Sequence, residues 1–154
     1  MSLTKDMEVL RSIPLFAKIE PAKLKLLAFT SERLSFMSGD EICREGDVGD
    51  AAYIILEGEA DVAVNAESGP MIVATLTKND IIGEIAVLCD VPRTATVIAK
   101  SELETLRVAK ENFFQLVTQF PQIGIQVMHE LAERLHHTTQ DLTRTKVKLA
   151  SLES

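Results

Sequence analysis

A chain of 154 residues with 46% hydrophobic and 25% charged residues has the composition of one globular domain with its own core. Its 16 basic and 23 acidic residues give a net charge of −7, which argues against nucleic-acid binding, because neutralising phosphates requires an excess of basic side chains. No apolar run is long enough for a membrane span and no secretory signal opens the chain. We therefore expect a cytoplasmic protein with no membrane insertion, in which Cys43 and Cys89 are free thiols.

The first 30 residues are predicted to form two helices. A short one runs through Val9 and Leu10 and ends before Pro14. Pro21 suits the first position of the second helix, because the missing N–H of proline has no partner there in any helix. The residues predicted to form the buried face of this second helix are Leu24, Leu26, Leu27 and Phe29.

Residues 31–109 have the pattern of short strands separated by turns. Leu34 and Phe36 alternate with polar neighbours, as do the apolar residues from 60 to 64. Glycine and aspartate mark the turns, and Asn79 is expected to adopt the left-handed backbone that glycine usually supplies. Many short strands at regular spacing predict a mainly β fold, a sandwich or a rolled barrel, and exclude an alternating β–α–β fold.

Residues 110–152 are predicted to be helical. A first helix ends at Phe120-Pro121, and a second runs from Gln122 almost to the end, over about 45 Å. Its three-four repeat comprises Met128, Leu131, Leu135, Thr138, Leu142, Thr145, Leu149 and Leu152. A repeat sustained over three heptads predicts pairing with another helix, most simply in a two-fold homodimer. The alternative is a helix that packs only on its own barrel.

Residues 81–97 combine a carboxylate and a guanidinium on one loop between two strands. Gly83 allows close approach of a ligand to the backbone, and Glu84 follows it directly. Arg93 lies after Pro92, before a second β-branched run. A carboxylate accepts hydrogen bonds from sugar hydroxyls, and a guanidinium binds phosphate through two donors. The loop therefore predicts a site for an anionic sugar phosphate.

The histidines argue against a metalloenzyme. All three, His129, His136 and His137, lie on the last predicted helix, whereas a small metal-binding β-barrel needs imidazoles inside the barrel. His129-Glu130 begins like a metalloprotease motif, but position 133 is Glu and not His. No nucleophile with a base partner stands out. We expect no metal, no cofactor and no catalytic residues.

These motifs resemble the cyclic-nucleotide-binding domain shared by bacterial catabolite activators, cyclic-nucleotide-dependent kinases and gated channels. The likeness covers nearly the whole chain, from Pro14-Leu15-Phe16 through Gly39, Gly46 and Gly58 to the closing helices. Its most specific part is Gly-Glu-Ile-Ala at 83–86 followed by Pro-Arg-Thr-Ala-Thr-Val at 92–97, which resembles the phosphate-binding cassette of that family. The resemblance implies a β-roll (a double-stranded β-helix, or jelly-roll-like barrel) with N-terminal helices and a long C-terminal helix.

The resemblance also implies a role for individual residues. Arg93 would pair with the cyclic phosphate, helped by the Ala95 amide or the Thr94 hydroxyl, and Glu84 would accept from the ribose 2′-hydroxyl. Backbone groups of Gly83, Ile85 and Ala86 would complete the cassette. The apolar wall under ribose and base would be Val62, Val73 and Leu76. Thr138 and Thr139 would contact the base; the alternative is that these threonines only set the register of the helix pair.

We therefore expect a single domain, residues 1–154, with N-terminal helices at 1–30 and a β-roll at 31–109 that carries the cassette at 83–95. Helices at 110–152 would serve as lid and dimer contact. The expected function is a regulatory sensor that binds cAMP, or cGMP, without chemical turnover and signals by repositioning its C-terminal helix. The Thr138-Thr139 match favours cAMP, and Thr94 is compatible with either base. The alternatives are a ligand-free dimerisation scaffold of the same fold and, less favoured, a small β-barrel enzyme.

Overall fold

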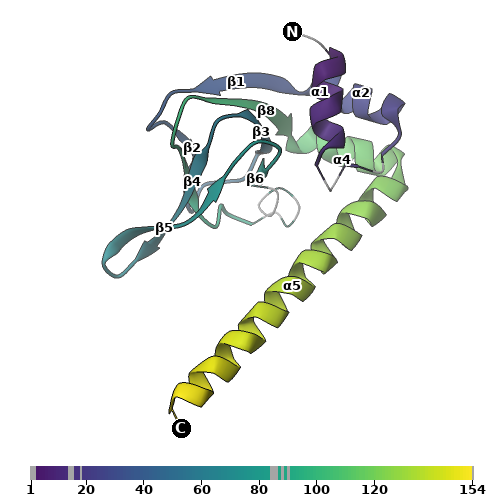
Figure 1. Ribbon diagram of the computed structural model, residues 1–154. Coiled ribbons are helices and arrows are strands. Elements are labelled where there is room, and N and C mark those ends of the chain that lie inside the picture. The colour runs from purple at the N-terminus through teal and green to yellow at the C-terminus, as the bar shows by residue number, and fades with distance from the viewer. Residues whose placement is uncertain are drawn as a thin grey trace.

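The computed structural model describes residues 3–13, 16–17, 19–83, 87, 89 and 91–153. Among these residues, three helices and a longer fourth one flank eight strands (Figure 1). In chain order they are α1 (Leu3–Arg11), α2 (Pro21–Thr30), β1 (Glu32–Phe36), β2 (Glu41–Cys43), β3 (Ala51–Glu57), β4 (Ala60–Ala66), β5 (Gly69–Leu76), β6 (Ile81–Ile82), β7 (Thr96–Ala99), β8 (Leu103–Ala109), α4 (Lys110–Gln119) and α5 (Pro121–Glu153).

The strands form two four-stranded sheets in which every pairing is antiparallel. One sheet has the order β1-β8-β3-β6 and the other β2-β7-β4-β5, so each sheet combines strands from both ends of the strand region. This arrangement confirms the predicted mainly β roll with flanking helices. The pairing of β6 with β3 aligns Ile82 with Tyr53, so Gly83, the next residue, lies beside the start of β3.

Two hydrophobic clusters form the core. Between the sheets, Ile55, Val97 and Leu103 belong to one cluster. Phe16, Leu24 and further residues of the helices belong to the other, where α1, α2 and α4 pack against one another at one end of the roll (Figure 1). Strands β3 and β8 contribute to both clusters, since Ile54 and Leu106 belong to the helical one, so these two strands join the roll to the helices.

The predicted buried face of α2 is wrong in part. Leu24, Leu27 and Ala28 are buried, but Leu26 is 46% and Phe29 is 77% exposed. Residues three and four apart share a helix face, so a face through Leu24, Leu27 and Ala28 turns the other two side chains outward. Apolar content alone does not distinguish the two faces.

Helix α5 is continuous, as predicted, and its 33 residues span about 50 Å. It packs on α4 at its start and then runs away from the roll (Figure 1). Leu131 of the three-four repeat is partly buried against the helical cluster, whereas Met128, Leu135, Leu142, Leu149 and Leu152 are exposed. Within the part of the chain that the structure describes, no helix is both long and apolar enough to cross a membrane.

Candidate functional site

A cavity of about 200 Å³ lies between the second sheet and the loop that precedes β7. Gly83 ends β6 with a positive φ of 80°, a backbone conformation that side chains other than glycine rarely adopt, and so turns the chain along the cavity wall. The residues that line the cavity are Cys43, Val62, Leu76, Ile81, Ile82, Gly83, Arg93, Thr94, Ala95 and Val97.

The backbone of Arg93 is held by the turn after β2. The amide of Arg93 donates to the carbonyl of Asp47 at 2.8 Å, and the amide of Gly46 donates to the carbonyl of Arg93 at 2.9 Å. The turn therefore fixes the position from which the Arg93 side chain extends.

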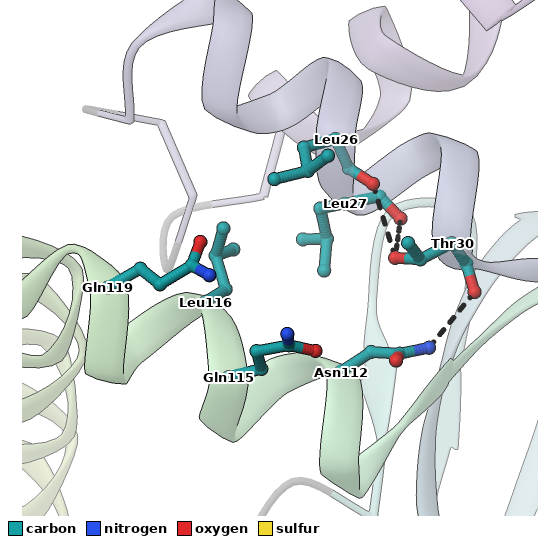
Figure 2. A pocket seen from close by; sticks show the side chains of 7 residues that line it. All are labelled: Leu26, Leu27, Thr30, Asn112, Gln115, Leu116 and Gln119. Atoms are coloured by element: carbon teal, nitrogen blue, oxygen red, sulfur yellow. Dashed lines mark hydrogen bonds between the residues drawn. The ribbon is translucent and has the colours of Figure 1, made fainter.

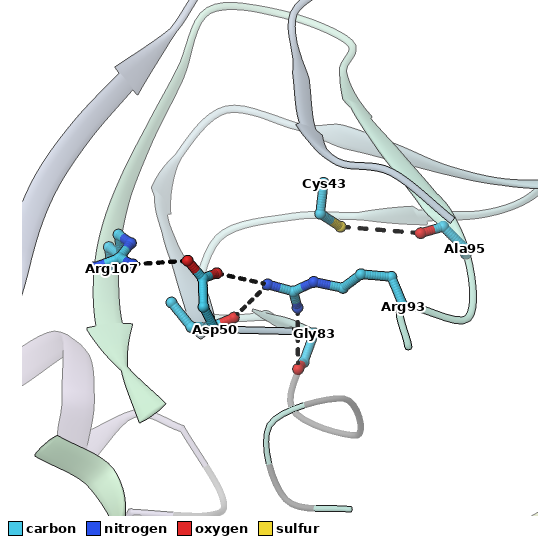
Figure 3. A network of polar contacts seen from close by, with 7 residues as sticks. Cys43, Asp50, Gly83, Arg93, Ala95 and Arg107 are labelled. Carbon is cyan, nitrogen blue, oxygen red and sulfur yellow. Dashed lines mark hydrogen bonds and ion pairs between the residues drawn. The ribbon is translucent and has the colours of Figure 1, made fainter. Parts of the chain in front are cut away.

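The guanidinium of Arg93 is buried, with 5% of the residue exposed. Its Nη2 donates to the carbonyl of Ala51 at 2.7 Å, and its Nη1 donates to the carbonyl of Gly83 at 3.3 Å (Figure 3). The terminal nitrogens of Arg93 therefore both have backbone acceptors on β3 and at the end of β6. These contacts reduce the cost of burying a charged group.

Asp50 lies between two arginines. Its Oδ1 is 3.8 Å from Nη2 of Arg93, and its Oδ2 is 3.3 Å from Nη2 of Arg107 on β8 (Figure 3). Burial lowers the pKa of Arg107, but Tyr53 and Asp50 more than offset that effect, so its pKa lies above its ordinary value and Arg107 carries its charge. Among the described side chains, Asp50 is the one carboxylate within 4.0 Å of Arg93.

Cys43 brings a thiol to the cavity wall. Its Sγ lies 4.0 Å from the carbonyl of Ala95 and donates to it (Figure 3). Burial raises the pKa of the Cys43 thiol, and the nearby charge of Arg93 offsets this only in part. The cavity therefore presents a neutral thiol opposite a buried cation.

A second cavity, of about 230 Å³, lies between α2 and α4 and is lined by Leu26, Leu27, Thr30, Asn112, Gln115, Leu116 and Gln119 (Figure 2). The amide nitrogen of Asn112 donates to the carbonyl of Thr30 at 3.2 Å across it. Among its lining residues there is no charged side chain. It therefore lacks the cation that an anionic ligand requires, which the cavity beside Arg93 has.

The structure brings six of the predicted site residues together at the cavity beside Arg93: Val62, Leu76, Gly83, Arg93, Thr94 and Ala95. Val73 is 53% exposed on β5, where the pairing with β4 shifts register between Val62 and Ala63. Thr138 and Thr139 are exposed on the part of α5 that runs away from the roll. The predicted residues Glu84, Ile85 and Ala86 lie outside the described residues.

Sequence reasoning does not find Asp50 or Arg107. Asp50 has the pattern of an ordinary turn residue, and Arg107 lies in an ordinary strand pattern. They meet because β3 pairs with β8, which aligns Tyr53 with Arg107. No local motif carries this information. Within the described residues, no group of three or more His, Cys, Asp or Glu side chains is arranged to hold a metal ion.

The family model for the cyclic nucleotide-binding domain matches residues 33–120. This match spans the roll, the cavity and α4, which is more than half of the chain. The chain therefore belongs to the cyclic nucleotide-binding domain family.

A curated relative agrees with this assignment. The chain is 33% identical over 133 residues to the cAMP-dependent protein kinase regulatory subunit of Blastocladiella emersonii, covering 86% of this chain and 30% of that protein. The chain thus spans less than a third of the length of this curated relative.

Two solved structures share the fold. The N-terminal domain of a transcriptional regulator from Streptomyces coelicolor A3(2) is 27% identical, with a TM-score of 0.75 over 87% of this chain and 94% of that one. The regulatory subunit of a cAMP-independent protein kinase A from Trypanosoma brucei, a mutant with cAMP bound in its A site, is 25% identical, with a TM-score of 0.76 over 94% of this chain and 51% of that one.

Proposed function

We propose that this chain is a regulatory module that binds a 3′,5′-cyclic nucleotide, with cAMP as the first choice, and does not transform it. The observation that carries the proposal is the buried guanidinium of Arg93 on the wall of a small cavity, next to Gly83 and the segment Thr94-Ala95. A local cation in a chain of net charge −7 is what an anionic ligand of this size requires.

When a phosphate binds in this cavity, its oxygens replace backbone carbonyls as the hydrogen-bond acceptors of Arg93. Arg93 now donates to two neutral carbonyls, and a phosphate offers charged oxygens that make stronger hydrogen bonds. The Ala95 amide and the Thr94 hydroxyl are candidates for further donors, since both residues line the cavity. Val62 and Leu76 supply apolar contact for ribose and base. Glu84 is proposed to accept from the ribose 2′-hydroxyl, with backbone groups of Ile85 and Ala86 beside it.

The proposed signal is a change in the position of α5. In this structure α5 leaves the roll, so Thr138 and Thr139 reach a base only if this helix, or that of a second copy, closes over the cavity (Figure 1). Val73 likewise requires a movement of β5 toward the cavity. A ligand that contacts the closed arrangement alone shifts the population toward it, and the lid position then reports occupancy.

We propose a homodimer through residues 122–152. The support is the exposed three-four repeat of α5, because such a seam is stable in water when a second helix covers it. A second copy would also bring its own threonine pair near the cavity. In this arrangement one ligand would contact both subunits.

Several observations favour cAMP over cGMP. The Blastocladiella emersonii relative is described as the regulatory subunit of a cAMP-dependent kinase, and the Trypanosoma brucei mutant is described with cAMP bound. Thr94 remains compatible with guanine. The same relatives are regulatory proteins, which supports a role without catalysis and without a cofactor. Two free thiols, Cys43 and Cys89, support a reducing compartment such as the cytoplasm.

Thermal and chemical unfolding with and without nucleotide tests the proposal. A ligand at about a hundredfold excess over its Kd adds about 2.7 kcal/mol to the free energy of unfolding, and cAMP should do so at lower concentration than cGMP. Arg93→Ala and the conservative Arg93→Lys should both abolish this gain, because neither side chain offers two coplanar donors. Unfolding of both variants without nucleotide checks that the loss does not merely reflect an unfolded chain.

The competing outcome is a ligand-free scaffold. The Trypanosoma brucei relative is described as belonging to a cAMP-independent kinase, so the fold by itself does not decide the ligand. If neither nucleotide stabilises the wild type while the chain still dimerises, the scaffold function is correct.

A further inference from the structure

Three charged groups meet beside the cavity: Arg93 of the predicted cassette, and Asp50 and Arg107 outside it. Arg107 and Arg93 contact opposite oxygens of the same carboxylate, that of Asp50 (Figure 3). The two contacts are unequal. The Arg107 contact, at 3.3 Å, is a hydrogen bond, whereas the Arg93 contact, at 3.8 Å, is longer than a hydrogen bond.

The three side chains also differ in exposure to solvent, and Arg93 is the most buried of them. The side chain of Arg93 is 4% exposed, that of Arg107 is 26% exposed, and that of Asp50 is 65% exposed. A carboxylate that reaches the solvent can move between two neighbours at little cost, whereas the buried guanidinium of Arg93 cannot. Asp50 is therefore the adjustable member of the group, and Arg107 is the partner that draws it away from Arg93.

Charge counting shows what Arg107 contributes. Two guanidiniums and one carboxylate leave the group with one net positive charge, which the single negative charge of a cyclic phosphate would neutralise. Without Arg107 the group would be neutral, and Asp50 would be free to pair fully with Arg93. A bound phosphate would then compete with Asp50 for the same guanidinium and leave an uncompensated negative charge.

We propose that Arg107 is a positioning residue that sets the affinity of the cavity for an anionic ligand by holding Asp50 away from Arg93. The proposal rests on the proposed function, because the anion concerned is the phosphate of a cyclic nucleotide. Asp50 pairs more closely with Arg107 as the phosphate takes over Arg93. Arg107 itself does not touch the ligand.

A double-mutant cycle with cAMP as the probe tests this role. Calorimetry on the full chain should give a Kd for Arg107→Gln that is about three- to tenfold weaker than for the wild type, as expected for the loss of one nearby charge contact. In an Asp50→Asn background, which removes the competing carboxylate, adding Arg107→Gln should change the Kd by less than about twofold. Arg107→Lys retains the charge and should recover most of the lost affinity.

Arg44→Gln is the matched control, because it removes an arginine that is ion-paired to Glu41 and changes the net charge equally, on an exposed surface turn. Melting of each variant without ligand checks that the fold persists. An equal loss of affinity from Arg107→Gln in both backgrounds, or no loss in the wild type, would overturn the proposal while leaving cyclic-nucleotide binding intact. A wild type that binds neither cAMP nor cGMP would overturn both proposals.

Discussion

The guanidinium of Arg93 fills the space that a side chain on Gly83 would need. A β-carbon on Gly83 would overlap Nη1 of Arg93, and the positive φ of 80° at Gly83 already disfavours any side chain. Glycine at this position thus serves two purposes: it turns the chain and it lets the arginine lie against the backbone.

Gly83→Ala should therefore weaken cyclic-nucleotide binding as well as the fold. The backbone strain alone should cost about 1–2 kcal/mol of unfolding free energy. The displaced guanidinium should in addition lower the affinity for cAMP by about tenfold or more, which calorimetry measures.

Gly39→Ala provides the control for this effect, because Gly39 has a similar φ of 95° and a β-carbon added there would have no neighbouring atom within 4 Å. It should lose a similar amount of stability and retain its affinity. Equal affinity losses in both variants would show that strain, and not contact with Arg93, is the cause.

A charge in the seam of α5 should weaken the proposed self-association. Leu142 is 56% exposed and belongs to the three-four repeat, whereas Val147 is 61% exposed and lies outside that repeat on the same helix. Leu142→Asp should raise the dimer dissociation constant by at least about tenfold, because it would place two carboxylates in one apolar contact. Analytical ultracentrifugation over a concentration series measures this constant.

Val147→Asp adds the same charge at nearly the same exposure and should leave the dimer intact. A monomeric wild type, or equal disruption by the two variants, would remove the support for a helix-seam dimer.

The buried ion pair between Asp6 and Arg33 should anchor α1 to β1. Both side chains are largely buried, at 13% and 24% exposed, and Arg33 also approaches Glu104. Asp6→Asn leaves a largely buried guanidinium with a weaker acceptor and should reduce the free energy of unfolding by about 2 kcal/mol in urea denaturation. Glu41→Gln, which breaks the exposed pair with Arg44, should cost less than about 0.5 kcal/mol.

The thiol of Cys43 should make stability depend on pH. Burial raises the pKa of this thiol in the folded chain, so the folded chain keeps the proton at pH values where the unfolded chain has lost it. Stability falls with rising pH wherever the native state binds more protons. Relative to Cys43→Ala, the wild type should therefore lose unfolding free energy as the pH rises above about 8.5, as urea denaturation at several pH values can measure. Cys89→Ser, at an exposed thiol, is the matched control.

Local patterns predicted much of this fold. Glycine, asparagine and proline signals located the turns, and Asn79 has the expected left-handed backbone with a φ of 74°. The break at Phe120-Pro121 separates α4 from α5 as predicted. These features depend on residues close in sequence, where steric rules act directly.

The features that the sequence did not predict depend on contacts between segments that are far apart in the chain. Arg93, Asp50 and Arg107 come from three separate segments, and only the register of β3 with β8 brings the last two side by side. The outward rotation of Leu26 and Phe29 likewise depends on how α2 packs, and not on its composition. The position of Thr138 and Thr139 relative to the cavity depends on the direction of α5, which no local pattern encodes.

Strand β5 offers an unpaired edge to a further strand. It lies at the edge of its sheet, and its consecutive apolar residues Met71, Ile72 and Val73 are all exposed. A helix seam with two-fold symmetry is saturated once two chains have joined, whereas a strand edge that accepts another strand can extend without limit. Pro70, which lacks a backbone donor, and the register shift beside Val62 both interrupt that edge. Strand addition at this edge is therefore opposed by two irregularities in a single hairpin.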